Sequence, residues 1–245
     1  MHQTLLKTPD LLTCRLIERI NRFVILIDYH GHTKYAHISN TGRLLDYLTS
    51  RRVVYCLRQP AQLKTDFRLV GVEDGADAAA LIDTRLQMQA FEQGLQREIF
   101  PWIKGVKRYD RDFPIGASRI DYGVHLQNGT TALIKVKSAV LRQGNSAMYP
   151  DCPSTRGQKH IRELIRYRSS GGEAHILFIA ALPAIQSFRP NQQRDPEIFE
   201  LLQQARLAGV DIHAIGMFLQ PSSGQIVLYE PDLPVQLEVQ NDVCQ

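Results

Sequence analysis

The sequence predicts a mixed α+β protein, with an N-terminal OB-like β-barrel over residues 1–80 and an α/β domain with a mixed sheet over residues 81–245. Three observations predict this fold class. Five short segments rich in β-branched and aromatic residues lie between residues 12 and 72, with no long helical pattern among them. The acidic, Gly-containing stretch GVEDGADAAA then has the composition of a linker. Beyond it, apolar strands alternate with amphipathic helices, as in an α/β domain.

The predicted barrel strands are separated by turn residues such as HGH and NTG, and they read LTCRLIERI, RFVILIDY, TKYAHI, RRVVYCLRQ and DFRLVGV. The Asn-Thr-Gly turn has two interpretations. Asn40, Thr41 and Arg43 around a glycine are suited to binding a phosphate. Alternatively, these residues form a plain turn and a short helix begins at Leu44. The residues alone favour the plain turn.

The C-terminal half contains three predicted helices and five predicted strands. The first helix, DTRLQMQAFEQGLQ, has apolar residues at a spacing of three to four. The second, STRGQKHIRELIRYRSSGG, ends at two glycines, and the third begins with Asp195 as N-cap and Pro196 at its first position. Strands are expected near 106–111, 118–126 and 131–140 and at AHILFIAAL and DIHAIGMFL. Asn128-Gly129 predicts a hairpin that pairs the second and third of these strands.

Composition argues against several classes of protein. The 245 residues are 44% apolar and 22% charged, which is ordinary for a globular protein. There is no run of 18 apolar residues and no signal-peptide pattern, so we expect no membrane partner and a cytoplasmic location. The four cysteines and eight histidines lack metal-ligand spacing, and free thiols are expected. Neither a nucleophile elbow nor a Gly-rich phosphate loop occurs.

The net charge of +4 is unevenly distributed along the chain. Residues 101–170 contain 13 Lys and Arg against 5 Asp and Glu, whereas the rest of the chain contains 16 against 20. A basic segment in an otherwise slightly acidic chain indicates an anionic partner such as nucleic acid, or else a solvated charged face. Charge alone does not separate these two interpretations.

The pair of segments SRIDYGVHL and TALIKVKS points most directly to chemistry. Side chains alternate along a strand, so Lys135 and Lys137 share one face, and the predicted hairpin brings Asp121 near both. In a metal-dependent phosphodiesterase, an aspartate and a strand carboxylate hold Mg²⁺, and a lysine stabilises developing charge. Here Lys135 occupies the carboxylate position. On spacing alone, a surface hairpin with charges facing water is the more frequent explanation.

The helix predicted over residues 156–168 has a cationic face. Lys159, Arg162 and Arg166 lie on one stripe, and Arg156 and Gln158 lie in the first turn. Cations in a first turn oppose the helix dipole, and a phosphate bound there would relieve this repulsion. The alternative is an ordinary solvated helix face.

Seven segments occur in a specific order: RINRFVILI, HISNTGRLLDYL, DTRLQM, SRIDYGVHL, IKVKSAVL, YPDCPSTRGQKHIREL and FRPNQQRDPEIFELLQQARLAGVDIHAI. Together they resemble the sugar fermentation stimulation protein A family over about residues 12–235, and RGQKH and NTGR are specific to it. The resemblance implies an OB-like barrel followed by a PD-(D/E)xK nuclease-like domain. It also implies a DNA-binding protein with an effect on sugar utilisation genes.

The resemblance further implies the functional residues. Asp121 and Lys137 match catalytic positions, and Lys135 stands at the position of the family's glutamate. Nucleic-acid contacts are implied for Arg22, Asn40, Thr41, Arg43, Ser118, Arg119, Arg156, Gln158, Lys159 and Arg162. The expected partner is DNA, with single- and double-stranded forms both open, and the oligomeric state is left open.

Departures from the family pattern weaken the catalytic interpretation. Besides Lys135, Thr155 stands where the family has Glu, and Met88 stands where Asn is usual. Hard cations need several oxygen ligands, and an ammonium at the metal position adds repulsion on the order of 1–4 kcal/mol at ~4 Å. Asp121 alone would therefore hold a metal weakly. Asp151 is a candidate replacement ligand, if it moves into the site.

We therefore predict a DNA-binding, regulatory protein whose nuclease-like site has lost or impaired metal catalysis. No cofactor is expected, and Mg²⁺ or Mn²⁺ would be required only if the chain is instead an active nuclease with altered ligands. A third interpretation, from a different class, is a regulatory protein that binds a small anionic ligand in the same pocket.

Overall fold

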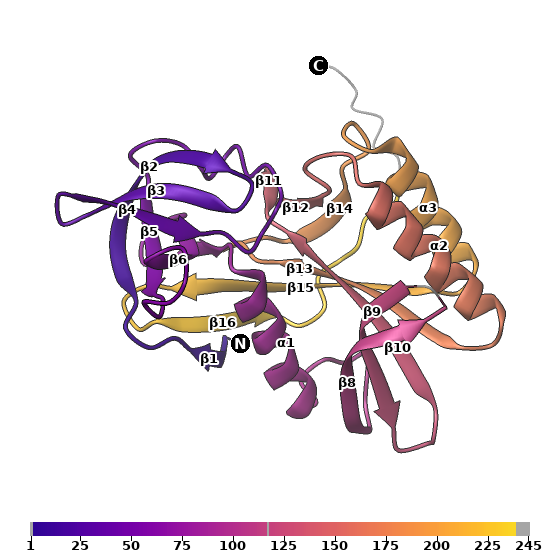
Figure 1. Ribbon diagram of the computed structural model, residues 1–245. Coiled ribbons are helices and arrows are strands. Elements are labelled where there is room, and N and C mark those ends of the chain that lie inside the picture. Colours follow the sequence, from indigo (N-terminus) through magenta and orange to yellow (C-terminus); the bar gives the residue numbers. More distant parts are fainter. Residues whose placement is uncertain (1, 117, 239–245) are drawn as a thin grey trace.

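The N-terminal part of the computed structural model, which describes residues 2–116 and 118–238, is a closed five-stranded barrel (Figure 1). Its strands are β2 (Leu12–Asn21), β3 (Val24–Tyr29), β4 (His32–His37), β5 (Val53–Arg58) and β6 (Phe67–Glu73). They pair in the order β4-β3-β2-β5-β6, and a parallel pairing of β4 with β6 closes the circle. The predicted OB-like barrel is confirmed.

The barrel interior follows from the alternation of side chains along each strand. Every second residue is buried, as with Cys14 and Leu16 in β2, Ile25 and Ile27 in β3, and Val54 and Cys56 in β5. Cys14, Cys56 and Cys152 are free thiols, and Cys244 lies outside the described residues. Residues 44–48, the alternative start of a short helix, form turns instead, with Leu44 at a φ of 53°.

The stretch expected to be a linker, residues 71–80, instead contains the end of β6 and the first two residues of strand β7 (Ala79–Leu81), which corrects that prediction. The three residues of β7, two alanines and a leucine, are fully buried. β7 pairs with β6 of the barrel on one side and with β15 (Asp211–Gln220) on the other. The barrel and the C-terminal sheet are thus hydrogen-bonded into one continuous sheet. The division at residue 80 stays a prediction.

The C-terminal sheet is mixed, as predicted. Its strands continue from β15 through β13 (Glu173–Ala180), β10 (Thr131–Ala139) and β9 (Ser118–Leu126) to β8 (Val106–Ile115). β15, β13 and β10 are mutually parallel, whereas β10, β9 and β8 form an antiparallel meander. β16 (Gln225–Glu230) pairs with β15, and β1 (Gln3–Lys7) pairs with β16. The sequence patterns did not predict β1 or β16.

The three predicted helices are present as α1 (Thr84–Gln96), α2 (Thr155–Ser169) and α3 (Pro196–Leu207). α2 and α3 lie side by side, and α2 packs against β13 while α3 packs against β15 (Figure 1). The N-caps are Asp83, Ser154 and Asp195. Asp83 is fully buried and also forms an ion pair with Arg68 of β6 at 2.8 Å, which ties α1 to the barrel.

A small second sheet lies beside the ends of the main strands. It consists of β11 (Leu141–Gln143), β12 (Ser146–Tyr149) and β14 (Ser187–Pro190). The β12 strand leads directly into the segment before α2, so it positions Tyr149 and Asp151 next to the site described below. Among the described helices, none is both long and apolar enough to cross a membrane.

Candidate functional site

Asp121 and Lys135 form an ion pair at the centre of the site. The antiparallel register of β9 and β10 places Tyr122 opposite Ile134, so Asp121 and Lys135 follow as neighbours. Lys135 Nζ lies 3.0 Å from Asp121 Oδ1, and the Val136 amide donates a hydrogen bond to Oδ2 at 2.7 Å. Lys135 is only 6% exposed. Both oxygens of Asp121 therefore already accept a hydrogen bond from β10.

The predicted hairpin creates this geometry. Gly129 adopts a φ of 86° in the turn, a conformation that favours glycine, and the Asn128 side chain accepts a hydrogen bond from the Thr130 amide at 3.0 Å. β9 and β10 leave this turn in register, with Thr131 opposite His125. The turn chemistry thus fixes which residues of β10 meet Asp121.

Lys137 lies two residues beyond Lys135 on the same strand and is half-buried. Its Nζ lies 5.7 Å from the centroid of the Tyr149 ring, a cation–π contact. Burial lowers the pKa of Lys137 to about 8, and the charges of Lys135 and Arg156 act in the same direction, while Asp121 opposes them. The Lys137 ammonium therefore loses its proton more readily than that of an exposed lysine.

Helix α2 borders the site with two buried polar residues. His160 is 5% exposed, and burial, followed by the nearby charges of Lys135 and Lys137, lowers the pKa of His160 to about 3. Glu163 is 7% exposed and accepts a hydrogen bond from Ser118 of β9. Neither residue was predicted from the sequence to be functional. An i, i+3 pair of His and Glu on a helix carries no specific signal by itself.

A first pocket, of about 290 Å³, opens on the α1 side of Asp121. It is lined by Arg85, Met88, Gln89, Glu92, Arg111, Asp112, Asp121 and Tyr122. Arg111 forms an ion pair with Glu92, which also accepts a hydrogen bond from Tyr122 at 2.7 Å. The thioether of Met88 therefore faces the same space as Asp121, where it offers only a weak ligand to a hard cation.

A second pocket, of about 250 Å³, lies where the barrel meets the C-terminal domain. Its walls come from four separate segments, and they include Arg22, Asn40, Thr41, Ser138, Tyr149, Asp151 and Ser154. Asn40 connects the barrel turn to β10, because its side-chain amide donates to Ser138 Oγ at 3.3 Å while its side-chain oxygen accepts from the Gly42 amide at 3.0 Å. Hereafter we call this the junction pocket. Three of the predicted nucleic-acid contacts meet in it.

Arg19 holds the two turns of the junction pocket in place. Its guanidinium donates to the carbonyls of Asn21 and Arg22 at 3.0 and 3.1 Å, and to those of Gly42 and Arg43 at 2.8 and 2.6 Å. The backbones that carry Arg22 and Arg43 are thereby fixed relative to each other. This role of Arg19 was not predictable from the sequence pattern, because Arg19 looks like any other outward residue of a barrel strand.

The other predicted contacts divide into exposed and internal groups. Arg22, Thr41, Arg43, Arg119, Arg156, Lys159 and Arg162 are exposed. Arg162 forms an ion pair with Glu197. Gln158 is buried, and its amide donates to Asp195 Oδ1 at 3.1 Å, so it joins α2 to α3 instead of facing solvent. Ser118 is likewise engaged with Glu163.

The residues of the site do not fit a divalent metal ion. No group of three or more His, Cys, Asp or Glu suited to hold a metal occurs within residues 2–116 and 118–238. Asp151 lines the junction pocket, whereas Asp121 lines the pocket beside α1. Asp151 Oδ2 is held there by the Leu44 amide at 3.1 Å. The carboxylate of Asp121 is paired with an ammonium, and the other candidate ligand faces a different pocket.

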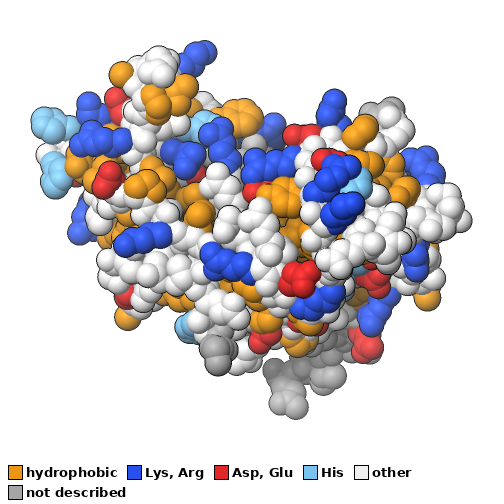
Figure 2. All heavy atoms as spheres, turned by 90° about the horizontal axis from the view of Figure 1, so that it is seen from below, with side chains coloured by type: hydrophobic (Ala, Val, Ile, Leu, Met, Phe, Trp, Pro, Cys, Tyr) orange, Lys and Arg blue, Asp and Glu red, His pale blue; other side chains and the backbone are white. Residues whose placement is uncertain are grey.

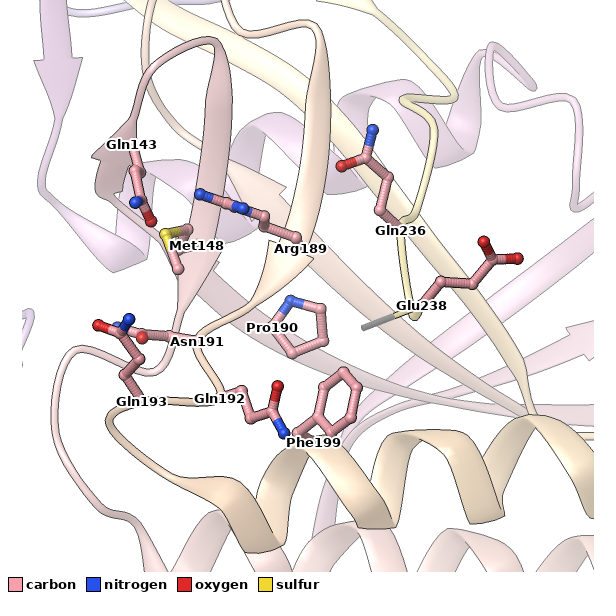
Figure 3. A pocket seen from close by; sticks show the side chains of 10 residues that line it. All are labelled: Gln143, Met148, Arg189, Pro190, Asn191, Gln192, Gln193, Phe199, Gln236 and Glu238. Carbon is pink, nitrogen blue, oxygen red and sulfur yellow. The ribbon is translucent and has the colours of Figure 1, made fainter. Parts of the chain in front are cut away.

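Surface charge extends beyond these pockets. Figure 2 shows a band of Lys and Arg side chains that crosses the molecule from the barrel side toward the opposite half, with a few acidic side chains among them. A further hollow lies away from the predicted residues, between the small sheet, α3 and the C-terminal segment (Figure 3). It is lined mainly by amides and includes Gln143, Asn191, Gln192, Gln193 and Gln236. None of the sequence-predicted site residues lines it.

Two family models match the chain. The model of the SfsA N-terminal OB domain matches residues 17–82, and the model of the sugar fermentation stimulation protein RE domain matches residues 85–223. Together they span most of the described structure.

Relatives and one solved structure show the same similarity over nearly full length. A sugar fermentation stimulation protein homolog of Pyrococcus furiosus is 42% identical over 233 residues, which are 95% of this chain and 99% of the relative. The homolog of Archaeoglobus fulgidus is 36% identical over 94% of this chain and 98% of the relative. The structure of Pyrococcus furiosus SfsA in complex with Ca²⁺ has a TM-score of 0.90 at 41% identity, and covers 96% of this chain and 99% of that one.

Proposed function

The chain belongs to the sugar fermentation stimulation protein family, and on this premise we propose that it is a DNA-binding protein with a regulatory role, whose nuclease-like site does not carry out metal-dependent cleavage. The absence of metal-dependent cleavage rests on the ion pair of Lys135 with Asp121 at 3.0 Å. The binding of DNA is supported by the cationic residues around the junction pocket and on α2. A cytoplasmic location remains part of the proposal.

DNA binding is supported by exposed cations on two parts of the molecule, the barrel turns beside the junction pocket and the start of α2. Arg22 and Arg43 extend from braced barrel turns, while Arg156 and Lys159 are exposed on the first turns of α2. The first turn of α2 contains no acidic residue, so its free amide groups and these cations favour an anion together. Phosphate groups of a nucleic acid match such an array of separated positive charges.

Loss of metal catalysis is supported by electrostatics at Asp121. A divalent ion at this carboxylate would have to displace the Lys135 ammonium, which is buried and has little room to move into solvent. Removing one partner of a buried pair is costly, on the order of 3–5 kcal/mol. Of the two other acids in the pocket that Asp121 lines, Glu92 is already paired with Arg111, which leaves Asp112. Mg²⁺ and Ca²⁺ need several oxygen ligands, and no group of three or more acidic, His or Cys residues suited to a metal occurs within residues 2–116 and 118–238.

The cleavage half is tested by incubating the purified protein with single- and double-stranded DNA, with and without Mg²⁺ or Mn²⁺. We expect no cleavage that depends on the added metal. Cleavage that requires metal and disappears in Asp121→Ala would contradict the proposal. Asp112→Ala, a neighbouring acid in the same pocket, serves as the matched control for that variant.

The binding half is tested by fluorescence anisotropy with labelled DNA over a range of salt concentration. If about four or five phosphates are contacted, log K should fall with log salt with a slope of roughly −3 to −5. Arg22→Ala should reduce this slope by about one unit. Arg206→Ala, an exposed arginine at the end of α3, should leave it unchanged. Binding that is absent or independent of salt would refute the proposal.

A second candidate function is an active metal-dependent nuclease with an altered ligand set. The observation that favours it is the solved complex of the Pyrococcus furiosus relative with Ca²⁺, because that protein is 41% identical to this chain. In this chain the alternative requires Lys135 to leave Asp121 when metal binds. The cleavage experiment above decides between the two functions.

A further inference from the structure

Lys137 is a lysine of the site without an acidic partner. Lys135 is paired with Asp121, and Lys159 lies 3.9 Å from Glu163. For Lys137 Nζ, no hydrogen bond or ion pair is formed with any residue in 2–116 or 118–238, and its described contact is the face of the Tyr149 ring. The amine group therefore has its hydrogen-bonding positions available to a ligand.

The surroundings of Lys137 make this amine reactive. Its stem is half-buried, the Lys135 ammonium lies two residues away on the same strand, and Arg156 approaches from α2. Desolvation and neighbouring cations are the two means by which proteins convert an ammonium into a neutral nucleophile. Burial first and the neighbouring cations next lower the pKa of Lys137 to about 8, which leaves roughly a tenth of the amine neutral at pH 7. Such a lysine attacks carbonyl carbons to form a Schiff base.

The position of Lys137 limits which carbonyl compound reaches it. The Tyr149 ring, which lies under the amine, also lines the junction pocket of about 250 Å³, so the amine lies next to that pocket. The cations around this pocket select a ligand that carries phosphates. An abasic site in DNA has both features, because it presents a small deoxyribose aldehyde between two phosphate groups and has no base to exclude.

We propose that the protein is an abasic-site lyase in which Lys137 is the nucleophile, an activity that rests on the proposed binding of DNA. The Lys137 amine adds to C1′ of the ring-opened sugar, and the resulting carbinolamine loses water to give an iminium ion. A C2′ proton then passes to solvent, the C3′–O bond breaks, and the 3′ phosphate leaves with the bonding electrons. Water hydrolyses the imine, which restores the lysine and releases an unsaturated aldehyde. The water lost in the first step is regained in the last, and no redox partner is needed.

The experiment is borohydride trapping on the full-length protein with a duplex that contains one abasic site. We expect a covalent protein–DNA adduct that depends on borohydride and maps by mass spectrometry to Lys137. Without borohydride, the same duplex should be nicked at the abasic site in the absence of divalent metal. Lys137→Arg keeps the positive charge but not the nucleophile, and it should lower adduct yield at least tenfold at a DNA concentration that saturates both proteins.

Controls separate this proposal from simple amine reactivity and from the DNA-binding proposal. Lys64→Arg, an exposed lysine in a barrel loop, should give the wild-type adduct yield. A duplex with a tetrahydrofuran analogue, which has no aldehyde, reports DNA binding without reaction. Circular dichroism and the melting temperature show whether Lys137→Arg is folded.

Three outcomes would overturn the lyase. An adduct of unchanged yield in Lys137→Arg, or one mapped to another residue, removes Lys137 from the chemistry. Binding to the analogue duplex without any adduct removes the lyase but leaves the proposed function intact. Absence of both binding and adduct removes both proposals.

Discussion

A single side chain, Lys135, changes what Asp121 can do. Its ammonium lies 3.0 Å from the carboxylate, and the backbone of the next residue occupies the second oxygen. A carboxylate in this position would leave room for a cation, whereas an ammonium provides the cation itself. The site thus keeps an electrostatic balance close to that of a metal-loaded carboxylate pair, but without a water-activating Lewis acid.

Lys135→Glu should therefore create a divalent-ion site. Two carboxylates would then face each other across the β9–β10 pair, and their mutual repulsion would be relieved by a bound cation. We expect calcium affinity measured by titration calorimetry to rise at least tenfold over the wild type. The double variant Asp121→Asn/Lys135→Glu should lose that gain. Equal calcium binding by wild type and Lys135→Glu would show that Lys135 does not control the site.

The sequence pattern predicted that Asp121 and Lys135 lie close together. It did not predict in which direction nearby side chains such as Gln158 point. Alternation along TALIKVKS and the Asn128-Gly129 turn predicted that Lys135 would lie near Asp121, and the structure pairs them. The placement of Gln158 was not predictable in the same way. Its position in a first turn suggested a ligand contact, but its direction depends on α3, which is about 40 residues farther along the chain.

At the level of elements, Asp195 connects two helices. As the N-cap of α3, it accepts from the Ile198 amide at 3.1 Å. It also accepts from the Ser154 amide at 2.9 Å, and Ser154 is itself the N-cap of α2. The side chain is almost completely buried. One carboxylate thus sets where both helices begin, and with them the position of the exposed cations on α2.

Asp195→Ala should destabilise the protein by about 2–4 kcal/mol, because it removes a cap and leaves the Ser154 amide and the Gln158 side chain unpaired in the interior. The free energy of unfolding from urea titration measures this. Glu197 lies in the first turn of α3 and forms an exposed ion pair with Arg162 of α2. Glu197→Ala should therefore lower the free energy of unfolding by less than about 1 kcal/mol. Similar losses for the two variants would contradict the assigned role.

Helix ends were the most predictable elements, and short strands were the least. The capping residue Asp195, followed by Pro196, identified the start of α3, and Gly171 at a φ of 90° follows α2 as the pair of glycines predicted. β7 could not be identified, because three apolar residues after an acidic turn are too few to show the alternation of a strand. Its partner β6 immediately precedes it in the sequence, whereas its other partner, β15, lies near the C-terminal end. Only the tertiary structure therefore defines β7 as a strand.

At the level of the whole molecule, a histidine pair makes stability depend on pH. His175 Nδ1 lies 3.3 Å from His213 Nε2, and the Trp102 ring stacks on His213 with centroids 4.2 Å apart. Burial, followed by the charge of His175, lowers the pKa of His213 to about 3. In the unfolded chain this histidine titrates near 6.5, so below that pH the unfolded state binds the extra proton.

The stability due to neutral His213 is therefore present above pH 6.5 and is lost progressively as the pH falls toward 3. Between pH 7.5 and 5 the loss should be about 1–2 kcal/mol. His213→Phe keeps the ring stack and removes the titrating group. From pH 7.5 to pH 5, its free energy of unfolding should therefore fall by about 1–2 kcal/mol less than that of the wild type. Urea titrations of both proteins at the two pH values measure the difference. Parallel declines would show that His213 does not contribute.

The strand β7 has a consequence for the proposed binding of a nucleic acid. Because the barrel and the C-terminal sheet share one ladder of hydrogen bonds, the turns that carry Arg22 and Arg43 cannot swing toward α2 as two jaws on a hinge would. The distance between the two groups of cations is set when the chain folds. In the proposed complex with duplex DNA, any mismatch in shape would then be absorbed by the nucleic acid, whose stiffness varies with its base steps. A rigid receptor of this kind would discriminate among sequences by their flexibility, even at positions where it touches no base.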